Sequence, residues 1–401
     1  MHPATLLLEP AVGVPAGFSA ASVPVHRAST VLFKDADSFA ARGRQLYDGY
    51  TYGLYGTPTT EALARKLAVL EGAERVLLAP SGLAAIHLVN LAVLRAGDHL
   101  LLSDAMYGPT RRAATDLLAG LGIEVEFYPP QCGSAIARLL RPETRLVWIE
   151  SPASLTMEMQ DVRAIVSAAR KSGAQVAMDN TWATPLRLRP LAMGVDFSVQ
   201  ALTKFVAAHA DVLMGSIAVS DAAIFRRLRD MQGLTGIAVS PDDCSLVLRG
   251  LETLDLRLER QTSTALAIAR WLEQQPAVGQ VLFPPLASDP GHALWKRDCR
   301  GAGSVLSLRL RDTGWPAARR FADALRLFRL GASWGGVHSL VAPYPSAPER
   351  RFGPPSNPQS AAAISGALLR LSVGLEDPRD LIEDLRRAVR AAAPSKRRKK
   401  S

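Results

Sequence analysis

Short apolar runs alternate with helical patterns through the middle of the chain. The clearest helix is TTEALARKLAVLEG, in which Leu63, Leu67 and Leu70 fall near helical spacing and Gly72 ends the pattern. The apolar segment RVLLAP follows, and SGLAAIHLVNLAVLRAG then predicts a second helix that begins at a Ser-Gly turn. The later runs HLLLSD, EVEFYP, RLVWIESP, QVAMDN and FSVQALTK predict buried strands. This alternation predicts a mainly parallel sheet covered by helices on both faces.

The pattern changes near Pro241. The stretch SLVLRGLETLDLRLERQTSTALAIARWLEQQ predicts one long amphipathic helix that links two domains. Beyond it, SVLSLRL and LLRLSVGLE predict strands, and AARRFADALRLF and DPRDLIEDLRRAVRAA predict covering helices. We therefore expect an N-terminal arm (1–55), a large domain (56–250), a smaller α+β domain (251–390) and a basic, disordered tail (391–401).

The net charge of +10 is concentrated at the end of the chain. Residues 396–400, KRRKK, supply five of these charges, which is typical of a solvated tail. The rest of the chain mixes both signs, so we expect no nucleic-acid binding by the folded body. We also expect no membrane association, because no uninterrupted apolar run is long enough to span a bilayer and the N-terminus lacks the pattern of a signal peptide.

The three cysteines, Cys132, Cys244 and Cys299, lie far apart in the chain. They form no CxxC pair and show no zinc-binding spacing. We interpret them as free thiols of a cytoplasmic protein and expect no metal site.

Four predicted strand ends or turns carry residues suited to chemistry. In a parallel sheet, ligands bind at the carboxyl ends of the strands. No Walker loop or GxGxxG motif is present, but Ser81-Gly82 at a helix start suits a phosphate. The segment Glu150-Ser151-Pro152 ends a third predicted strand. A half-buried Lys204 would lose its proton easily and attack a carbonyl, and Asp179 could keep a pyridine nitrogen protonated. Taken singly, each fits a solvated lysine or a turn aspartate better, so the argument depends on their combination.

Eight stretches between about Val31 and Leu385 carry a resemblance to a known family. They are YGLYGTPTT, LEGAERVLLAPSGLAAI, ESPASLTMEMQDV, MDNTWATPL, QALTKFVAAHADVLMGS, GHALWKRDCRGAGSVLSL, SWGGVHSL and LLRLSVGLED. In this order they resemble the cysteine/methionine-metabolism (trans-sulfuration) family of fold-type I enzymes, which use pyridoxal 5'-phosphate (PLP), and within it the bacterial lyases that act on cystathionine. The resemblance implies the fold-type I transferase fold, an α/β fold with a mostly parallel seven-stranded sheet and a smaller α+β C-terminal domain. It also implies a homotetramer built from dimers that share active sites.

The resemblance assigns roles to the residues at matching positions. Lys204 matches the lysine that carries PLP as a Schiff base and then moves the Cα proton. The other matches are Asp179 for the pyridinium nitrogen, Gly82, Leu83 and Thr203 for the phosphate, Tyr107 for the ring stacked on the cofactor, Tyr52 for the phosphate in the neighbouring subunit, Arg370 for the substrate α-carboxylate, and Ser333 and Trp334 for the substrate. Tyr107 and Trp334 also fit packed core residues, and Ser333 is matched by position alone.

The implied reaction is β-elimination from L-cystathionine, which gives homocysteine, pyruvate and ammonia. The wording SWGG and ESPASLTMEM favours it over the γ-lyase and γ-synthase reactions of the same family. Cysteine desulfhydration is a further alternative for this sulfur amino-acid substrate class. A PLP-fold protein that binds or regulates without catalysis is another.

Several positions depart from the family pattern. Leu54 stands where the family has an arginine that clamps the phosphate, and the nearest arginines in sequence are Arg42 and Arg44. Ala208 replaces a glycine near Lys204, and Ala332 replaces a tyrosine beside the substrate. These changes bear on cofactor affinity and substrate range. We interpret the neighbouring His209 as a structural histidine rather than a catalyst.

Overall fold

The computed structural model describes residue 5 and residues 20–347, 350–351 and 366–392, and its largest element is a seven-stranded sheet. The strand order is β1-β7-β6-β5-β4-β2-β3. β7 runs antiparallel to both of its neighbours, and the remaining neighbours are parallel. The predicted α/β fold with a mostly parallel sheet is therefore confirmed. The strands are Arg75–Ala79 (β1), His99–Ser103 (β2), Glu124–Tyr128 (β3), Thr144–Glu150 (β4), Gln175–Asp179 (β5), Phe197–Ala201 (β6) and Gly215–Val219 (β7).

Successive side chains of these strands enter two different cores, one on each face of the sheet. In β4, Val147 belongs to the first core and Trp148 to the second. Helices α3 and α6 contribute to the first core, and α4 and α8 contribute to the second. Because both faces are covered, the strands are nearly continuous apolar runs, which is why the sequence pattern identifies them. The helices of this part are α2 (Ala36–Ala40), α3 (Pro58–Glu71), α4 (Gly82–Val93), α5 (Gly108–Ala113), α6 (Val162–Ser172), α7 (Thr184–Arg187) and α8 (Ala222–Thr235).

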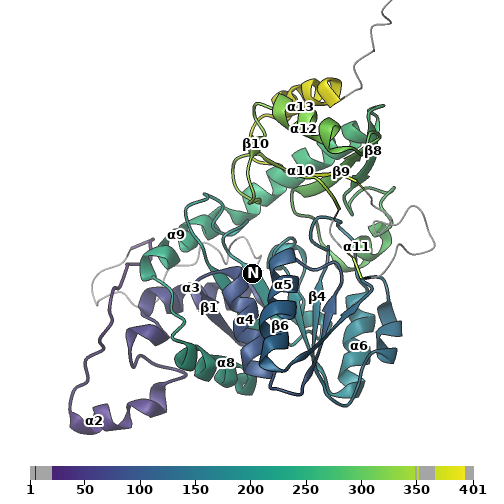
Figure 1. Ribbon diagram of the computed structural model, residues 1–401. Coiled ribbons are helices and arrows are strands. Elements are labelled where there is room, and N and C mark those ends of the chain that lie inside the picture. The colour runs from purple at the N-terminus through teal and green to yellow at the C-terminus, as the bar shows by residue number, and fades with distance from the viewer. Residues whose placement is uncertain (1–4, 6–19, 348–349, 352–365, 393–401) are drawn as a thin grey trace, which may run out of the picture.

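A second, five-stranded sheet with the order β10-β11-β12-β9-β8 forms the smaller unit, at the top of Figure 1. The long helix α10 runs from α9 into this unit and contacts β8, β9 and α13. The elements of this part are α9 (Pro241–Glu252), α10 (Leu254–Glu273), β8 (Val278–Leu282), α11 (His292–Asp298), β9 (Val305–Leu310), α12 (Trp315–Ala324), β10 (Arg329–Leu330), β11 (Leu340–Tyr344), β12 (Leu368–Ser372) and α13 (Pro378–Ala392).

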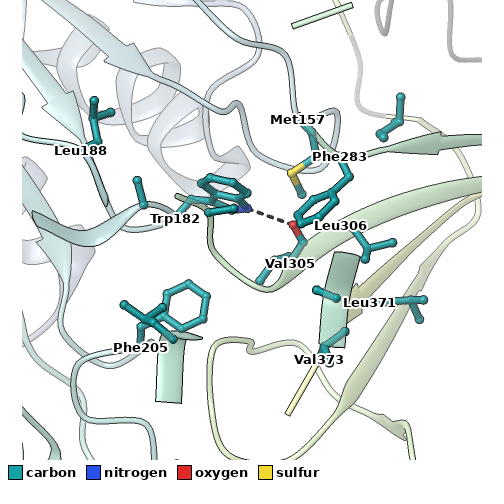
Figure 2. Close-up of a cluster of buried hydrophobic side chains, with 14 of the residues drawn as sticks. Met157, Trp182, Leu188, Phe205, Phe283, Val305, Leu306, Leu371 and Val373 are labelled. Carbon is teal, nitrogen blue, oxygen red and sulfur yellow. Dashed lines mark hydrogen bonds between the residues drawn. The ribbon is translucent and has the colours of Figure 1, made fainter. Parts of the chain in front are cut away.

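One hydrophobic core joins the two sheets. Figure 2 shows Trp182, which follows a strand of the first sheet, directed toward Val305 of the second, and Phe205 and Leu371 belong to the same core. The indole Nε1 of Trp182 donates a hydrogen bond to the carbonyl oxygen of Val305 at 3.0 Å. The two sheets therefore share buried apolar surface, which fixes their relative position.

The predicted long linking helix is in fact two helices, so that prediction was wrong. α9 ends at Glu252 and α10 begins at Leu254, with Thr253 between them at φ −107° and ψ 9°. At Gly250, an added Cβ would lie 2.6 Å from the carbonyl oxygens of both Val206 and Ala207. The absence of a side chain at Gly250 lets α9 pack closely on the loop that follows Lys204, a tertiary constraint that apolar spacing does not reveal.

Arg257 stabilises the junction between α9 and α10 through hydrogen bonds. Its guanidinium is buried and donates hydrogen bonds to the carbonyl oxygens of Phe205 at 2.7 Å and Gly250 at 2.6 Å. Nε also donates to the hydroxyl of Thr253 at 3.0 Å, the residue at the helix break. Burial lowers the pKa of Arg257 to about 10. The site of Lys204 is thus connected to the helix junction through one side chain.

The described residues include part of the predicted N-terminal arm and the predicted boundary between the small domain and the tail. Within the predicted arm, the backbone N–H of His26 bonds to Thr59 Oγ1 at 2.8 Å, while α2 extends to the lower left of Figure 1. At the other end, α13 runs through Ala392, two residues past the predicted boundary at 390, and residues 393–401 lie outside the described part. The other domain boundaries stay predictions.

We predict that Arg257→Met lowers the free energy of unfolding by about 3 kcal/mol, because buried carbonyl groups lose a charged donor. The measurement is urea unfolding of the cofactor-free protein. Arg270→Met, an exposed residue of the same helix, is the matched control and should change stability by less than about 0.5 kcal/mol. Equal losses in the two variants would contradict the structural role of Arg257.

Candidate functional site

A cavity of about 200 Å³ opens where the carboxyl ends of β1, β4, β5 and β6 face β9 and β12 of the second sheet. Eight of the ten predicted site residues line it, and Ser333 and Tyr52 are the two that do not. The eight are Gly82, Leu83, Tyr107, Asp179, Thr203, Lys204, Trp334 and Arg370.

Lys204 follows β6 and projects its amine into this cavity. Nζ donates a hydrogen bond to Ser333 Oγ at 3.0 Å and lies 5.5 Å from the centre of the Trp334 ring. Burial is the main cause that lowers the pKa of Lys204 to about 8, and Arg370 lowers it further, although Asp179 acts in the opposite direction. A large fraction of this amine is therefore neutral at mildly alkaline pH, as a nucleophile or a base requires.

Asp179 is the last residue of β5, and its carboxylate is oriented by Thr181. Oδ1 accepts the hydroxyl of Thr181 at 2.5 Å and the backbone N–H of the same residue at 3.0 Å. Thr181 Oγ1 in turn accepts the N–H of Ala201 at 2.9 Å, which ties the end of β5 to β6. Burial raises the pKa of Asp179, while the Thr181 bonds and Lys204 act to lower it.

The start of α4 approaches the cavity closely because residue 82 is glycine. A Cβ added to Gly82 would lie 2.6 Å from Cβ of Ala201 in β6, so no larger residue fits without a shift. Ser81 is the N-cap, and its Oγ accepts the N–H of Ala84 at 3.1 Å. The first N–H groups of a helix have no partner within it, so this end of the cavity suits an anion. Thr203, also on the wall, donates its hydroxyl to the carbonyl oxygen of Met214 at 3.2 Å.

Arg370, in β12, is a buried cation that faces the cavity. It is 6% exposed and donates to the carbonyl oxygens of Ala332 at 2.9 Å and Ser333 at 3.1 Å. Within the described residues, no carboxylate forms an ion pair with its guanidinium, and burial lowers its pKa. A desolvated guanidinium without a counter-ion is suited to an anionic ligand, and its planar fork matches a carboxylate.

Aromatic residues form two sides of the cavity. Tyr107 is 43% exposed, which contradicts a packed core position. Trp334 lines the cavity and also packs edge-on against Phe205, with ring centres 5.5 Å apart, so it serves both surfaces. Tyr52 is 52% exposed and lies outside the cavity wall, so its role in a neighbouring subunit stays a prediction.

The positions that depart from the family pattern lie in different places. Ala332 lines the cavity, whereas Leu54 lines a separate small cavity beside Arg229. Ala208 has a left-handed backbone at φ 66°, where a glycine would be less strained. His209 Nδ1 lies 2.7 Å from the carbonyl oxygen of Ala207, outside the cavity wall, as a structural histidine would.

Sequence reasoning assigned no role to three polar residues of the wall, which are Glu150, Ser154 and Thr181. Glu150 was noted only as a strand end, yet its carboxyl lies in the cavity and accepts the backbone N–H of Tyr107. Thr181 lies within the quoted stretch MDNTWATPL, but nothing in its spacing distinguishes it from Asn180. Across the described ranges, no cluster of three metal-ligating side chains occurs, and no helix is long and apolar enough to cross a membrane.

Comparison with known proteins gives consistent matches over nearly the whole chain. The family model described as "Cys/Met metabolism PLP-dependent enzyme" matches residues 4–390. A Rhizobium johnstonii protein assigned to the cystathionine beta-lyases is 45% identical, over 92% of this chain and 91% of that protein. A cystathionine beta-lyase of Bordetella avium is 40% identical, over 94% of each chain.

Similar proteins with other names also match. An L-alanine/L-glutamate racemase of Wolbachia pipientis is 37% identical, over 91% of each chain. A crystal structure of cystathionine gamma synthase from Xanthomonas oryzae pv. oryzae has a TM-score of 0.87 and 34% identity, and the match covers 98% of both chains. These similarities extend across the fold and leave the individual reaction open.

We predict that Lys204 of the cofactor-free protein titrates with an apparent pKa of about 8. Competitive acetylation with a peptide lysine in the same tube, read by mass spectrometry from pH 6 to 11, should show half-maximal labelling about two units below the usual lysine value of about 10.4. Arg370→Met should move this midpoint upward, because it removes a neighbouring positive charge. Labelling that follows the peptide lysine would show that the amine is not desolvated.

Proposed function

Because the chain belongs to the family of Cys/Met metabolism PLP-dependent enzymes, we propose that it is a carbon–sulfur β-lyase that cleaves L-cystathionine. The products are homocysteine, pyruvate and ammonia. The observation that carries the proposal is the meeting in one cavity of a partly neutral Lys204 and a buried Arg370 that has no carboxylate partner among the described residues.

The family's cofactor is PLP, and the residues of the cavity fit it. The close approach that Gly82 permits brings the first turn of α4 to the wall, where its free N–H groups would hold the phosphate. Lys204 would bind the aldehyde carbon, and Asp179 would face the ring nitrogen. When bound, this cofactor supplies an electron sink for negative charge at the substrate Cα.

Side chains of the cavity bind the substrate and transfer its protons. Arg370 binds the substrate α-carboxylate and thereby sets the direction of the Cα–H bond. Lys204 Nζ, held by Ser333, takes the Cα proton and passes a proton to the departing sulfur. The Cβ–S bond breaks, the sulfur leaves as the thiol of homocysteine, and one water converts the remaining three carbons to pyruvate and ammonia.

Two features support β-elimination over the γ reactions. The two most similar of the named relatives carry the beta-lyase name, whereas the gamma synthase is less similar in sequence. Trp334 belongs to the SWGG segment, whose wording favours the β reaction, and it lies beside Lys204 in the cavity. Ala332 at the wall leaves room for a long substrate such as cystathionine, with its second amino-acid group.

Assembly and location are further parts of the proposal. Tyr52, half-exposed on the N-terminal segment, is free to contact a neighbouring subunit in a dimer that shares active sites. We propose a homotetramer of such dimers in the cytoplasm. Sedimentation of the protein with and without PLP measures the assembly.

The test of the function is a product assay on L-cystathionine with added PLP. We expect pyruvate and homocysteine in equal amounts, and Lys204→Ala should lose at least about 10³ of the rate because it removes the proton-transfer group. Formation of 2-oxobutyrate and cysteine would contradict the β reaction and indicate γ-elimination. Conversion of L-alanine to D-alanine without pyruvate from cystathionine would indicate a racemase.

We predict that Arg370→Ala raises KM for cystathionine and lowers kcat/KM. The loss of transition-state stabilisation should be about 2–5 kcal/mol, because a desolvated carboxylate loses its partner. Arg370→Lys is the matched control. This variant keeps the charge but loses the bidentate geometry, so its kcat/KM should lie between those of the native protein and Arg370→Ala. Unchanged kcat/KM in Arg370→Ala would show that this residue does not bind the carboxylate.

A further inference from the structure

Glu150 is a carboxyl group in the cavity to which no role has been given. It is the last residue of β4, and its Cα is paired in register with that of Asp179 at the end of β5. Neighbouring strands lie about 4.8 Å apart, so two carboxyl groups enter the same cavity side by side. Such an arrangement is unfavourable unless one of them stays protonated.

A hydrogen bond of the Glu150 carboxyl joins the end of β4 to the start of α5. Oε2 accepts the backbone N–H of Tyr107 at 2.6 Å, and the backbone N–H of Ser154 acts together with that of Tyr107 to lower the pKa of this carboxyl. Tyr107 precedes the short helix α5, and its side chain caps nothing. Ser154 lies in a tight turn where the N–H of Met157 bonds to the carbonyl oxygen of Ala153 at 3.0 Å. Glu150 therefore anchors the backbone that carries the exposed Tyr107 ring.

We propose that Glu150 is a positioning residue: its carboxyl holds the Tyr107 backbone at the rim and so fixes the Tyr107 ring over the cavity. The inference rests on the proposed function only in that Tyr107 is the ring expected to stack on the cofactor. The anchoring itself is a property of the cofactor-free chain.

The surroundings of Glu150 favour its neutral form. Burial, followed by the negative charge of Asp179, raises its pKa well above the usual range, although the two backbone N–H groups act to lower it. The other titratable groups of the cavity wall are Tyr107, Asp179, Lys204 and Arg370. A neutral Glu150 still accepts the Tyr107 N–H through one oxygen, and it leaves Asp179 as the carboxylate that balances the two cations.

Three substitutions separate anchoring from charge. Glu150→Gln keeps an oxygen acceptor and is neutral at every pH. Glu150→Ala removes the acceptor, and Glu150→Asp withdraws it by one methylene while keeping an acid. Glu71→Gln is the matched control, because Glu71 is a buried carboxyl that bonds to Ser198 and Gln200 away from the cavity wall.

The primary measurement is amide hydrogen exchange of residues 105–109 in the cofactor-free protein. We expect exchange at Tyr107 to become at least tenfold faster in Glu150→Ala and Glu150→Asp, and to stay within about twofold in Glu150→Gln and Glu71→Gln. Glu150→Asp keeps the test available if the alanine variant does not fold. Unchanged exchange in both the alanine and aspartate variants would overturn the proposal.

Cofactor retention supplies the second measurement. PLP should dissociate about tenfold faster from Glu150→Asp than from the native protein, while Glu150→Gln should retain it from pH 6 to 9. Loss of PLP from Glu150→Gln equal to that from Glu150→Asp would show that an ionised carboxylate is required and would overturn the anchoring role. Because neither measurement involves substrate, a result that contradicts β-elimination leaves this inference standing.

Discussion

The structure depends on holding two cations, Lys204 and Arg370, in one desolvated cavity. They come from different sheets, Lys204 from the end of β6 and Arg370 from β12. Burial lowers the pKa values of both groups, and the positive charge of Arg370 lowers the pKa of Lys204 further. A cavity of this kind persists only where the surrounding structure fixes both backbones and supplies polar partners for both side chains.

Both requirements are met at the seam between the two sheets. The shared core around Trp182 and Val305 holds the sheets together directly beside the cavity, and both residues also form part of its wall. Arg257 holds the carbonyl groups that follow Lys204, and Gly250 lets α9 approach the same loop. Arg370 is bound to the carbonyl groups of the segment that carries Ser333, the hydrogen-bond partner of Lys204. Each cation is thus positioned through the segment that contacts the other.

The fold could be predicted from the sequence because its strands are buried on both faces. Runs such as RLVWIE have one interpretation when flanked by helical periods, and the corresponding strand, β4, lies where the run predicts it. The break between α9 and α10 could not be predicted, because apolar spacing continues across Thr253. The close contact of Gly250 with a loop about 45 residues earlier leaves no local signal in the sequence either. Short-range patterns report local periodicity and burial, and they carry no record of which distant carbonyl a glycine or an arginine will meet.

The candidate site shows the same division. Lys204 and Asp179 could be predicted from the sequence, because a parallel sheet binds ligands at its strand ends. Glu150 occupies an equivalent strand end, yet a carboxylate there has no obvious use beside Asp179 until the backbone N–H of Tyr107 is seen to bond to it.

The charges of the wall then account for what the cavity can accept. Two cations face one carboxylate if Glu150 is neutral, so an anionic group lowers the electrostatic energy of the site. If Glu150 were ionised, the wall would already be balanced, and both the cofactor phosphate and the substrate carboxylate would enter against a closer negative charge. Leu54, where the family pattern predicts an arginine, lines a separate cavity. Arg42 and Arg44 do not line the cavity of Lys204 either, so Lys204 and Arg370 are the cations that the described residues give to its wall. A neutral Glu150 leaves the attraction of these two cations for an anion undiminished.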